Sequence, residues 1–148
     1  MSPERLWKLS AALWPAHRRL ALLVKKVNSA IYHNSLPPNV SFQPDIRFGH
    51  HGFGTVIHSN VVIGRRVWIW HNVTITVHAA STSPHRIVIE DDVRIGANSV
   101  IIAPAERSLR IGRGARIGAG AVVAQDVPAG ASVISPPPRV LGGEQPEA

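Results

Sequence analysis

An isoleucine or valine returns at six-residue intervals through most of this chain, and this repeat constrains the fold more than any other feature. The lead residues of the repeat are Ile57, Ile63, Ile69, Ile75, Ile89, Ile95, Ile101, Ile111, Ile117 and Val123. A helix with 3.6 residues per turn would scatter such positions around its axis, and a half-buried strand would alternate with a period of two. We therefore expect an all-β solenoid of short parallel strands joined by tight corners, with each lead residue pointing into a narrow core.

Two further positions keep the register of the lead residues. A small or β-branched residue stands four places after most leads, at Val61, Val67, Val73, Val93, Ser99, Ala115, Ala121 and Val127. Glycine directly follows Ile63, Ile95, Ile111 and Ile117. A flat strand does not need recurring glycines, whereas tight corners between short strands require small residues. Both positions therefore support the solenoid.

Length and composition indicate one domain. A chain of 148 residues is long enough to bury a core, and with aromatic residues at 5% that core is expected to consist of stacked aliphatic side chains. The absence of cysteine excludes disulfides, thiolate metal sites and a cysteine nucleophile. No apolar run approaches the ~20 residues of a membrane span and the first residues do not resemble a cleavable signal, so we expect a cytoplasmic protein.

The net charge of +7 is concentrated in the first part of the chain. Residues 1–36 hold six basic side chains against one acid, Glu4. The repeat region is nearly balanced, so the high pI does not indicate a nucleic-acid-binding domain. Such a basic segment favours weak contact with an anionic membrane surface or a polyanionic partner, and the alternative is a solvated helix face.

A short helical arm precedes the repeat. Apolar residues at helical spacing predict helices over 3–14 and 16–33, divided at Pro15 because proline removes a backbone donor and clashes with the preceding turn. We divide the chain into an N-terminal helical arm, a repeat domain and a Pro-rich C-terminal tail. These three parts are residues 1–36, 37–135 and 136–148.

The first interruption of the repeat contains two adjacent histidines. Taking Val40 and Ile46 as the first leads, eleven residues separate Ile46 from Ile57 where two hexads need twelve. The slip spans glycines together with His50 and His51. Because the repeat itself supplies only a scaffold, we expect chemistry where its register breaks.

Two more interruptions are loops. Residues 76–86 make a protruding loop that ends near His85, because fourteen residues separate two leads where two hexads need twelve. Residues 103–110 extend one hexad by four residues. The histidine makes the first of these loops the second place where chemistry is expected.

The chain resembles the hexapeptide-repeat acyltransferase superfamily, and within it the serine O-acetyltransferase branch and its relatives that acetylate sugars. The segments that carry this resemblance are residues 50–58, 67–75, 85–87, 93–99, 117–123 and 127–130. The resemblance implies a left-handed parallel β-helix with 18-residue triangular coils. It also implies acetyl-CoA as the acetyl donor and a homotrimer with active sites between neighbouring subunits.

The resemblance places a catalytic base on one of the adjacent histidines. Acetyl transfer from a thioester to a hydroxyl needs a base for the hydroxyl proton, and histidine suits this task near neutral pH. Counting back from the strand at Val61 puts the base on His51, whereas counting forward from Ile46 puts it on His50, which we prefer. The Asp that orients the base in serine acetyltransferases is missing, which puts serine as acceptor in doubt.

His85 matches the histidine of the family's active-site loop, and the resemblance makes it an auxiliary residue from the opposing subunit. The proline that follows in the family is Arg86 here, and the register differs by one residue. The remaining histidines of the repeat, His58, His71 and His78, occupy non-core positions and are interpreted as exposed or interface residues. We expect no metal site, because β-helical zinc enzymes need three histidine ligands with two of them close in sequence.

By the same resemblance, the acetyl-CoA groove runs along two stacked Gly-Ala turns. These turns are Gly96-Ala97 and Gly118-Ala119, although corner geometry favours small residues there with or without a ligand. Arg139 stands where the family often has a basic residue beside the nucleotide phosphates, and Arg113 and Arg116 are weaker candidates. The family's Gly-Gly after the Ile75 strand is Thr76-Val77 here, which is expected to narrow the groove.

These features favour an acetyl-CoA-dependent O-acetyltransferase that uses a histidine base. The acceptor hydroxyl belongs to serine or to a sugar or polysaccharide, since the arm is much shorter than the helical domain of serine acetyltransferases. The alternative is a catalytically degenerate trimeric scaffold, and the departures at Thr76, Val77 and Arg86 motivate it.

Overall fold

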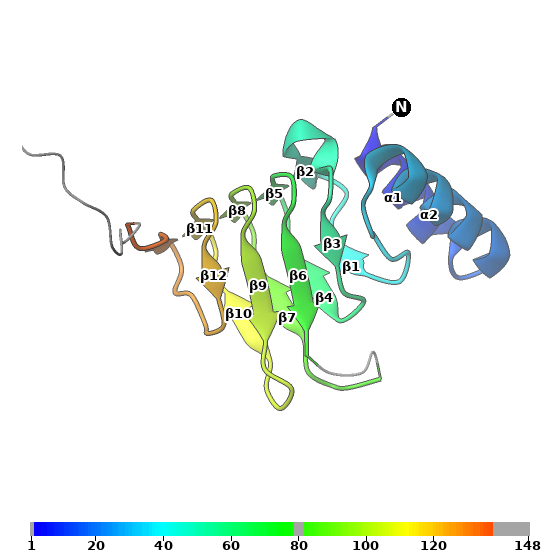
Figure 1. Cartoon of the computed structure of the whole chain (residues 1–148). Helices are drawn as coiled ribbons and strands as arrows, with labels where there is room; N and C mark the ends of the chain where they lie inside the picture. Colours follow the sequence, from blue (N-terminus) through cyan, green and yellow to red (C-terminus); the bar gives the residue numbers. More distant parts are fainter. Residues whose placement is uncertain (1, 79–81, 138–148) are drawn as a thin grey trace, which may run out of the picture.

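The computed structural model describes residues 2–78 and 82–137. Two helices, α1 (Pro3–Leu13) and α2 (Arg18–Tyr32), precede a solenoid of short strands. Every strand pairs in parallel with the strand one coil away. In Figure 1 the coils stack side by side, with both helices at one end and β13 at the other. This architecture confirms the all-β solenoid with a short helical arm and agrees with a left-handed parallel β-helix.

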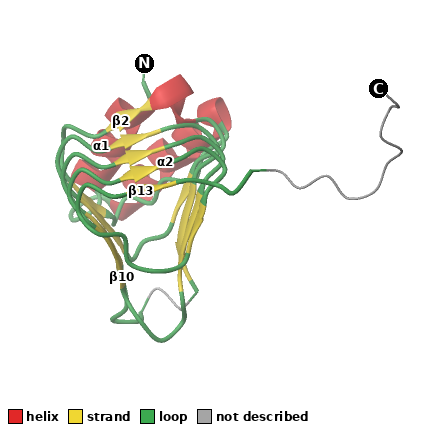
Figure 2. Ribbon diagram, turned by 90° about the vertical axis from the view of Figure 1, so that its left-hand side faces the viewer, coloured by secondary structure: helices red, strands yellow, loops and turns green. Residues whose placement is uncertain are grey.

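Three parallel sheets form the sides of a triangle, as the view along the stack shows (Figure 2). Sheet A contains β3 (Val56–Ile57), β6 (Thr74–Val77), β9 (Val100–Ala103) and β12 (Val122–Val123). Sheet B contains β1 (Ser41–Phe42), β4 (Val61–Ile63), β7 (Ile87–Ile89) and β10 (Leu109–Ile111). Sheet C contains β2 (Arg47–Phe48), β5 (Trp68–Ile69), β8 (Arg94–Ile95), β11 (Arg116–Ile117) and β13 (Ser132–Val133).

The lead residues stack on one another from coil to coil. Ile63 pairs with Ile89, and Ile75 pairs with Ile101. Every lead residue from Ile57 to Val123 is buried, and so are the small or β-branched residues four places after most of them, Val61, Val67, Val73, Val93, Ser99, Ala115, Ala121 and Val127. Apolar surface is removed from water along continuous ladders, which is the main stabilisation available to so narrow a core.

The first coil corrects the expected register. Phe42 pairs with Ile63 and Phe48 pairs with Ile69, so the leads of this coil are phenylalanines. Val40 and Ile46, which were expected to be leads, are buried at the position four places after a lead. The first interruption is therefore an insertion of three residues between Phe48 and Ile57, not the loss of one. It contains a 3-10 turn, η1 (Gly49–Gly52).

Aromatic leads occur in the first coil because helix α1 covers its open end. Trp7 is fully buried, and its ring stacks on Phe42 with centroids 4.1 Å apart. Its indole Nε1–H donates to the Pro37 carbonyl at 2.8 Å. A carboxylate oxygen of Glu4 accepts the Phe48 N–H at 3.0 Å, so α1 also satisfies an edge of sheet C.

The helical arm is divided into two helices at Pro15, as the sequence predicts. The expected helices over 3–14 and 16–33 are observed as α1 and α2, with Pro15 between them. Two buried polar side chains join the helices: Ser10 Oγ donates to the Ala21 carbonyl at 2.7 Å, and Asn28 Nδ2 donates to the Pro3 carbonyl at 3.2 Å. The arm is thus a helical hairpin fixed to the first coil.

Three corners connect the sheets. The groove corner links sheet C to sheet A through residues 49–55, 70–73, 96–99 and 118–121. The described residues of the loop corner, which links sheet A to sheet B, are 58–60, 78, 82–86, 104–108 and 124–126. The charged corner links sheet B to sheet C through residues 43–46, 64–67, 90–93, 112–115 and 128–131.

Close stacking of the corners explains the glycine that follows a lead residue. A Cβ on Gly112 would lie 2.4 Å from the Ala129 backbone nitrogen, and a Cβ on Gly96 would lie 2.6 Å from the Ala119 nitrogen. Both obstacles are backbone of the next coil, which cannot move without breaking the parallel ladder. Glycine is therefore required at these corners by the coil spacing alone.

We expect Gly112→Ala to destabilise the protein by about 3 kcal/mol, since the added methyl group overpacks against backbone. Gly114→Ala is the matched control, because no atom lies within 4 Å of its Cβ position. Its positive φ of 69° should cost only about 1 kcal/mol. Urea unfolding of both variants measures the difference, and an equal or smaller loss for Gly112→Ala would contradict the stacking explanation.

Candidate active site

The inserted turn of the first coil holds its histidines in an unusual backbone conformation. His50 and His51 have φ of 49° and 56°, and Gly52 follows with 55°. The other coils have a single left-handed residue at the groove corner, at Asn72, Asn98 and Gly120. A left-handed conformation costs a residue with a Cβ roughly 1–2 kcal/mol. The chain therefore retains two histidines where glycine would relieve strain, and such strain clusters at functional sites.

The structure separates the two histidines by what their rings contact. The His50 ring lies against His71 of the next coil, with centroids 5.0 Å apart in an edge-to-face arrangement. The His51 ring stacks on Tyr32 of α2 at 5.9 Å. His50 therefore faces along the groove corner, whereas His51 faces the helical arm.

His71, which the sequence places at a non-core position, contacts His50 in the structure. Its ring is half-buried, and its Nδ1 is a buried atom without a hydrogen-bond partner. A signal in the sequence was available: Phe48 pairs with Ile69, and each is followed two residues later by a histidine, His50 and His71. This shared spacing becomes visible only when Phe48 is taken as a lead residue of the repeat.

A groove of about 480 Å³ runs along the groove corner on the same side as these histidines. Its lining is Trp70, Arg94, Gly96, Ala97, Arg116, Ile117, Gly118, Ala119, Ser132, Val133 and Ile134. All four residues of the two Gly-Ala turns named from the sequence are in this lining. Trp70 lines the groove and directly precedes His71 in the chain, whereas His50 and His71 themselves are not part of the lining.

Two arginines give the groove a basic wall. Arg94 pairs with Arg116 across neighbouring strands of sheet C, and both side chains are exposed. Trp68 continues the same row and stacks on Trp70 with ring centroids 4.6 Å apart. The groove thus combines a small-residue floor, an aromatic end and cationic groups at one side.

His85 lies at the loop corner, away from His50. Its backbone carbonyl accepts a hydrogen bond from Asn60 Nδ2 at 3.3 Å, and its N–H donates to Ser83 Oγ at 3.2 Å. His58 and His78 are at the same corner. Within one chain the structure therefore does not bring His85 together with His50 or His51.

The residues that depart from the family pattern, Thr76, Val77 and Arg86, do not line the groove described above. Thr76 and Val77 extend β6 and pair with Ile102 and Ala103, so they do not narrow the groove lined by this chain. Arg86 is exposed, and its N–H donates to Ser108 Oγ at 3.1 Å. Arg139 and the tail after residue 137 lie outside the described residues.

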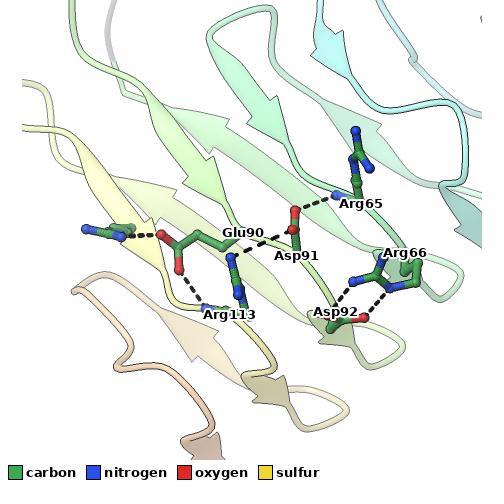
Figure 3. A network of polar contacts seen from close by, with 7 residues as sticks. Arg65, Arg66, Glu90, Asp91, Asp92 and Arg113 are labelled. Carbon is green, nitrogen blue, oxygen red and sulfur yellow. Dashed lines mark hydrogen bonds and ion pairs between the residues drawn. The ribbon is translucent and has the colours of Figure 1, made fainter.

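Opposite charges alternate from coil to coil at the charged corner (Figure 3). Arg66 donates to both carboxylate oxygens of Asp92, at 2.6 and 2.8 Å. Glu90 accepts from the Arg110 side chain and, at 2.7 Å, from the Arg113 N–H. Arg113 therefore belongs to this corner and does not line the groove, which leaves Arg116 as the better placed of the two weaker candidates.

These pairs shift the pKa of their members. Hydrogen bonds from Arg110, followed by the bond from the Arg113 N–H, lower the pKa of Glu90 below its ordinary value. The hydrogen bond from Arg66 lowers the pKa of Asp92, and the same contact raises the pKa of Arg66. The charged form of each carboxylate is thus favoured in the folded chain, although solvent screens these exposed pairs.

Among residues 2–78 and 82–137, no three histidine, aspartate or glutamate side chains lie close enough together to hold a metal ion. Neither described helix combines the length and apolar character that crossing a membrane requires.

The fold and groove define a hexapeptide-repeat β-helix, and comparisons with known proteins agree. A family model, the hexapeptide repeat of succinyl-transferase, matches residues 86–125. A 2,3,4,5-tetrahydropyridine-2,6-dicarboxylate N-acetyltransferase of Staphylococcus aureus strain JH9 is 49% identical over 65 residues, which are 44% of this chain and 25% of that protein. The chain spans about a quarter of the length of such curated relatives.

Solved serine acetyltransferases share the fold over nearly the whole chain. The soybean serine acetyltransferase apoenzyme superposes with a TM-score of 0.77 at 30% identity, over 92% of this chain and 55% of that one. A serine acetyltransferase in complex with CoA gives a TM-score of 0.77 at 26% identity, over 94% of this chain and 56% of that one. Residues 86–125 thus contain the hexapeptide repeat of this family model, and the chain is serine acetyltransferase-like in fold.

We expect the charged corner to make stability depend on pH in the acid range. Because the pKa values of Glu90 and Asp92 are lowered in the folded chain, their stabilisation is fully present above their ordinary values of 4.5 and 3.8. It is lost as the pH falls through the lowered values. The melting temperature of a Glu90→Gln, Asp92→Asn variant should therefore fall below that of the parent at pH 7 and approach it below pH ~4.

High salt is the control for this prediction, because screening weakens exposed pairs. The gap between variant and parent at pH 7 should narrow as salt is added. A gap that stays constant from pH 7 to pH 3 would show that these pairs do not stabilise the fold.

Proposed function

We propose that the protein is an acetyl-CoA-dependent O-acetyltransferase in which His50 is the general base. The observation that carries this proposal is the course of the groove: Trp70 lines it, and the adjacent His71 contacts the His50 ring. A ligand lying along the Gly-Ala turns would therefore point one end at His50. The serine acetyltransferase fold and the acetyltransferase names of the relatives support the same reaction class.

The groove suits the long, narrow arm of coenzyme A. Successive coils are about 4.8 Å apart, so three coils from Gly118 to His50 span about 14 Å along the corner. An extended pantetheine arm covers this distance. The small turns leave backbone amides accessible to the arm, and Arg94 and Arg116 provide positive charge for the phosphates.

The chemistry needs one base and one group that stabilises negative charge. His50 would take the proton of the acceptor hydroxyl while that oxygen attacks the thioester carbonyl and forms a C–O bond. The tetrahedral oxyanion then collapses, the C–S bond breaks, and the thiolate of CoA receives the proton from the His50 imidazolium. The acetyl ester and free CoA leave without an acyl-enzyme intermediate.

His71 supplies the stabilising group in this proposal. A proton on its buried Nδ1 would have no acceptor, so the ring carries its proton on Nε2. This N–H is then available beside His50 to donate a hydrogen bond to the developing oxyanion.

The acceptor is proposed to be a hydroxyl of serine or of a sugar. The soybean neighbour was also solved with serine bound, at 30% identity to this chain. The neighbour of His50 on the N-terminal side is Gly49 rather than an aspartate, which favours a sugar or polysaccharide at least as strongly as serine. Because the curated relative is named as an N-acetyltransferase, an amine is the alternative acceptor that should be tested beside these hydroxyls.

We also propose a homotrimer. His85 at the loop corner and His50 at the groove corner belong to different edges of the triangle, so only two adjacent copies can bring them into one site. This arrangement agrees with the auxiliary role expected for His85 from a neighbouring subunit. The mass of the protein in solution tests this assembly without depending on activity.

The decisive experiment is an assay of thiol release from acetyl-CoA, with serine, simple sugars, glycan fragments and amines as acceptors. We expect release with at least one hydroxyl acceptor. If thiol is released only with amine acceptors, the protein is an N-acetyltransferase and the proposed O-acetylation is wrong. If no acceptor gives release and acetyl-CoA leaves the melting temperature unchanged, the enzyme proposal fails and the scaffold alternative stands.

Replacing the two adjacent histidines separates their roles. His50→Ala should lower kcat by about 100-fold or more, which is the usual contribution of a general base. His51→Ala should leave kcat near the parental value, because its ring contacts Tyr32 instead of the groove corner. Measured with saturating acetyl-CoA, the opposite ranking would move the base to His51.

The replacement His71→Phe distinguishes catalysis from packing. The phenyl ring keeps the contact with His50 and removes the unpartnered Nδ1, so the melting temperature should not fall. We expect kcat to decrease by about 100-fold, as for the loss of an oxyanion donor, while KM for acetyl-CoA changes little. Parental activity in this variant would show that His71 serves only as packing.

A further inference from the structure

Helix α2 presents an apolar stripe to solvent. Its exposed large apolar side chains are Leu20, Leu22, Leu23, Val27 and Ile31, each 42–55% exposed. Four of them follow one another at intervals of three or four residues and so share one side of the helix. A row of leucine, valine and isoleucine side chains that are about half exposed is unusual on a water-facing helix, and contiguous apolar patches mark interaction surfaces.

The buried side of α2 does not account for this stripe. Ala21, Asn28 and Tyr32 face α1 and the first coil, and they are the buried residues of the helix. The hairpin is already fixed by the hydrogen bonds of Ser10 and Asn28. The exposed stripe is therefore a second surface, separate from the one that anchors the arm.

Basic residues accompany the stripe, and α2 contains no acid. Arg19 and Lys26 are seven residues apart, so they share one flank beside Leu23. Arg18 and Lys25 occupy the next side of the helix by the same spacing. The acid of the arm, Glu4, is held by the Phe48 N–H on the side of α1 that faces sheet C.

We propose that α2 binds the surface of an anionic membrane. The leucine-rich stripe would enter the boundary between headgroups and acyl chains, and the arginines and lysines would contact the anionic headgroups. Interfacial helices are recognised by this combination of an apolar face and a basic polar face. With 15 residues the helix is suited to lie in the interface plane and not to span it.

The position of α2 leaves the groove accessible in this bound state. Both helices lie at the end of the stack next to β1 and β2, whereas the Gly-Ala turns that line the groove belong to later coils (Figure 1). Docking through the arm therefore does not cover the groove. An acceptor carried at a membrane surface, such as a glycan, would be brought near the protein.

A second copy of the chain is the competing occupant of the stripe. Two α2 helices facing each other would bring four basic residues from each copy together without an acid on either helix. An anionic surface meets the same residues with opposite charge. Charge complementarity therefore favours lipid over self-association.

Sedimentation with vesicles tests the proposal and uses the whole chain. We expect binding to phosphatidylglycerol–phosphatidylcholine vesicles, weak or no binding to phosphatidylcholine alone, and a decrease as salt is added. Leu23→Asp with Val27→Asp should reduce binding by about tenfold or more, because charge is placed in the stripe. Arg19→Glu with Lys26→Glu should have a similar effect through the headgroups.

The variant Val122→Asp is the matched control, since Val122 is 69% exposed on β12 at a distance from the arm. It should bind vesicles like the parent, and melting curves check that each variant is folded. Equal binding to both vesicle types, or no binding, overturns the proposal. If the stripe variant instead lowers the mass in solution, the stripe joins two copies. Acetyl transfer plays no part in these readouts, so failure here is separate from failure of the proposed enzyme.

Discussion

The parallel backbone ladder between coils is the interaction on which the rest of the structure depends. It holds each coil about 4.8 Å from the next, and every side chain of one coil must fit against its equivalent in the neighbour. Ile69 therefore stacks between Phe48 and Ile95 in the core. At the corners the same spacing leaves no room for a Cβ, because a Cβ added to Gly112 would lie 2.4 Å from the Ala129 backbone nitrogen. The stacked lead residues and the corner glycines therefore both follow from the distance between successive coils.

The same spacing builds the candidate site. Residues at equivalent positions of a corner are stacked in a column, however many residues separate them in the chain. His50 and His71 meet in this way although twenty residues lie between them, and Ala97 and Ala119 follow at the equivalent positions of later coils. The site is therefore an edge of the solenoid, in which an inserted turn at one coil adds the chemical groups that the repeat lacks.

Sequence periodicity predicted the features that many coils share and failed where one coil differs. The buried leads from Ile57 to Val123 and the helical arm could be predicted, because each repeats a strong local pattern. The register of the first coil could not be predicted, because its lead residues are Phe42 and Phe48. Both of these rings pack against Trp7 of the arm. This tertiary contact produces no periodic pattern in the sequence. Taking Val40 and Ile46 as lead residues therefore concealed that His50 and His71 share one register. The different surroundings of His50 and His51 likewise depend on Tyr32, a residue far away in sequence.

Backbone strain argues for chemistry at the inserted turn more strongly than the presence of histidine does. A scaffold needs one left-handed residue at each groove corner, and Gly54, Asn72, Asn98 and Gly120 provide it. The three inserted positions are also left-handed, and only the third is a glycine. Glycine at His50 and His51 would remove roughly 1–2 kcal/mol of strain at each. The unpartnered Nδ1 of His71 adds a further cost beside them. Single left-handed residues with a Cβ also occur at the charged corner, at Arg66 and Asp92, so what distinguishes the inserted turn is two consecutive ones beside an unpartnered ring nitrogen.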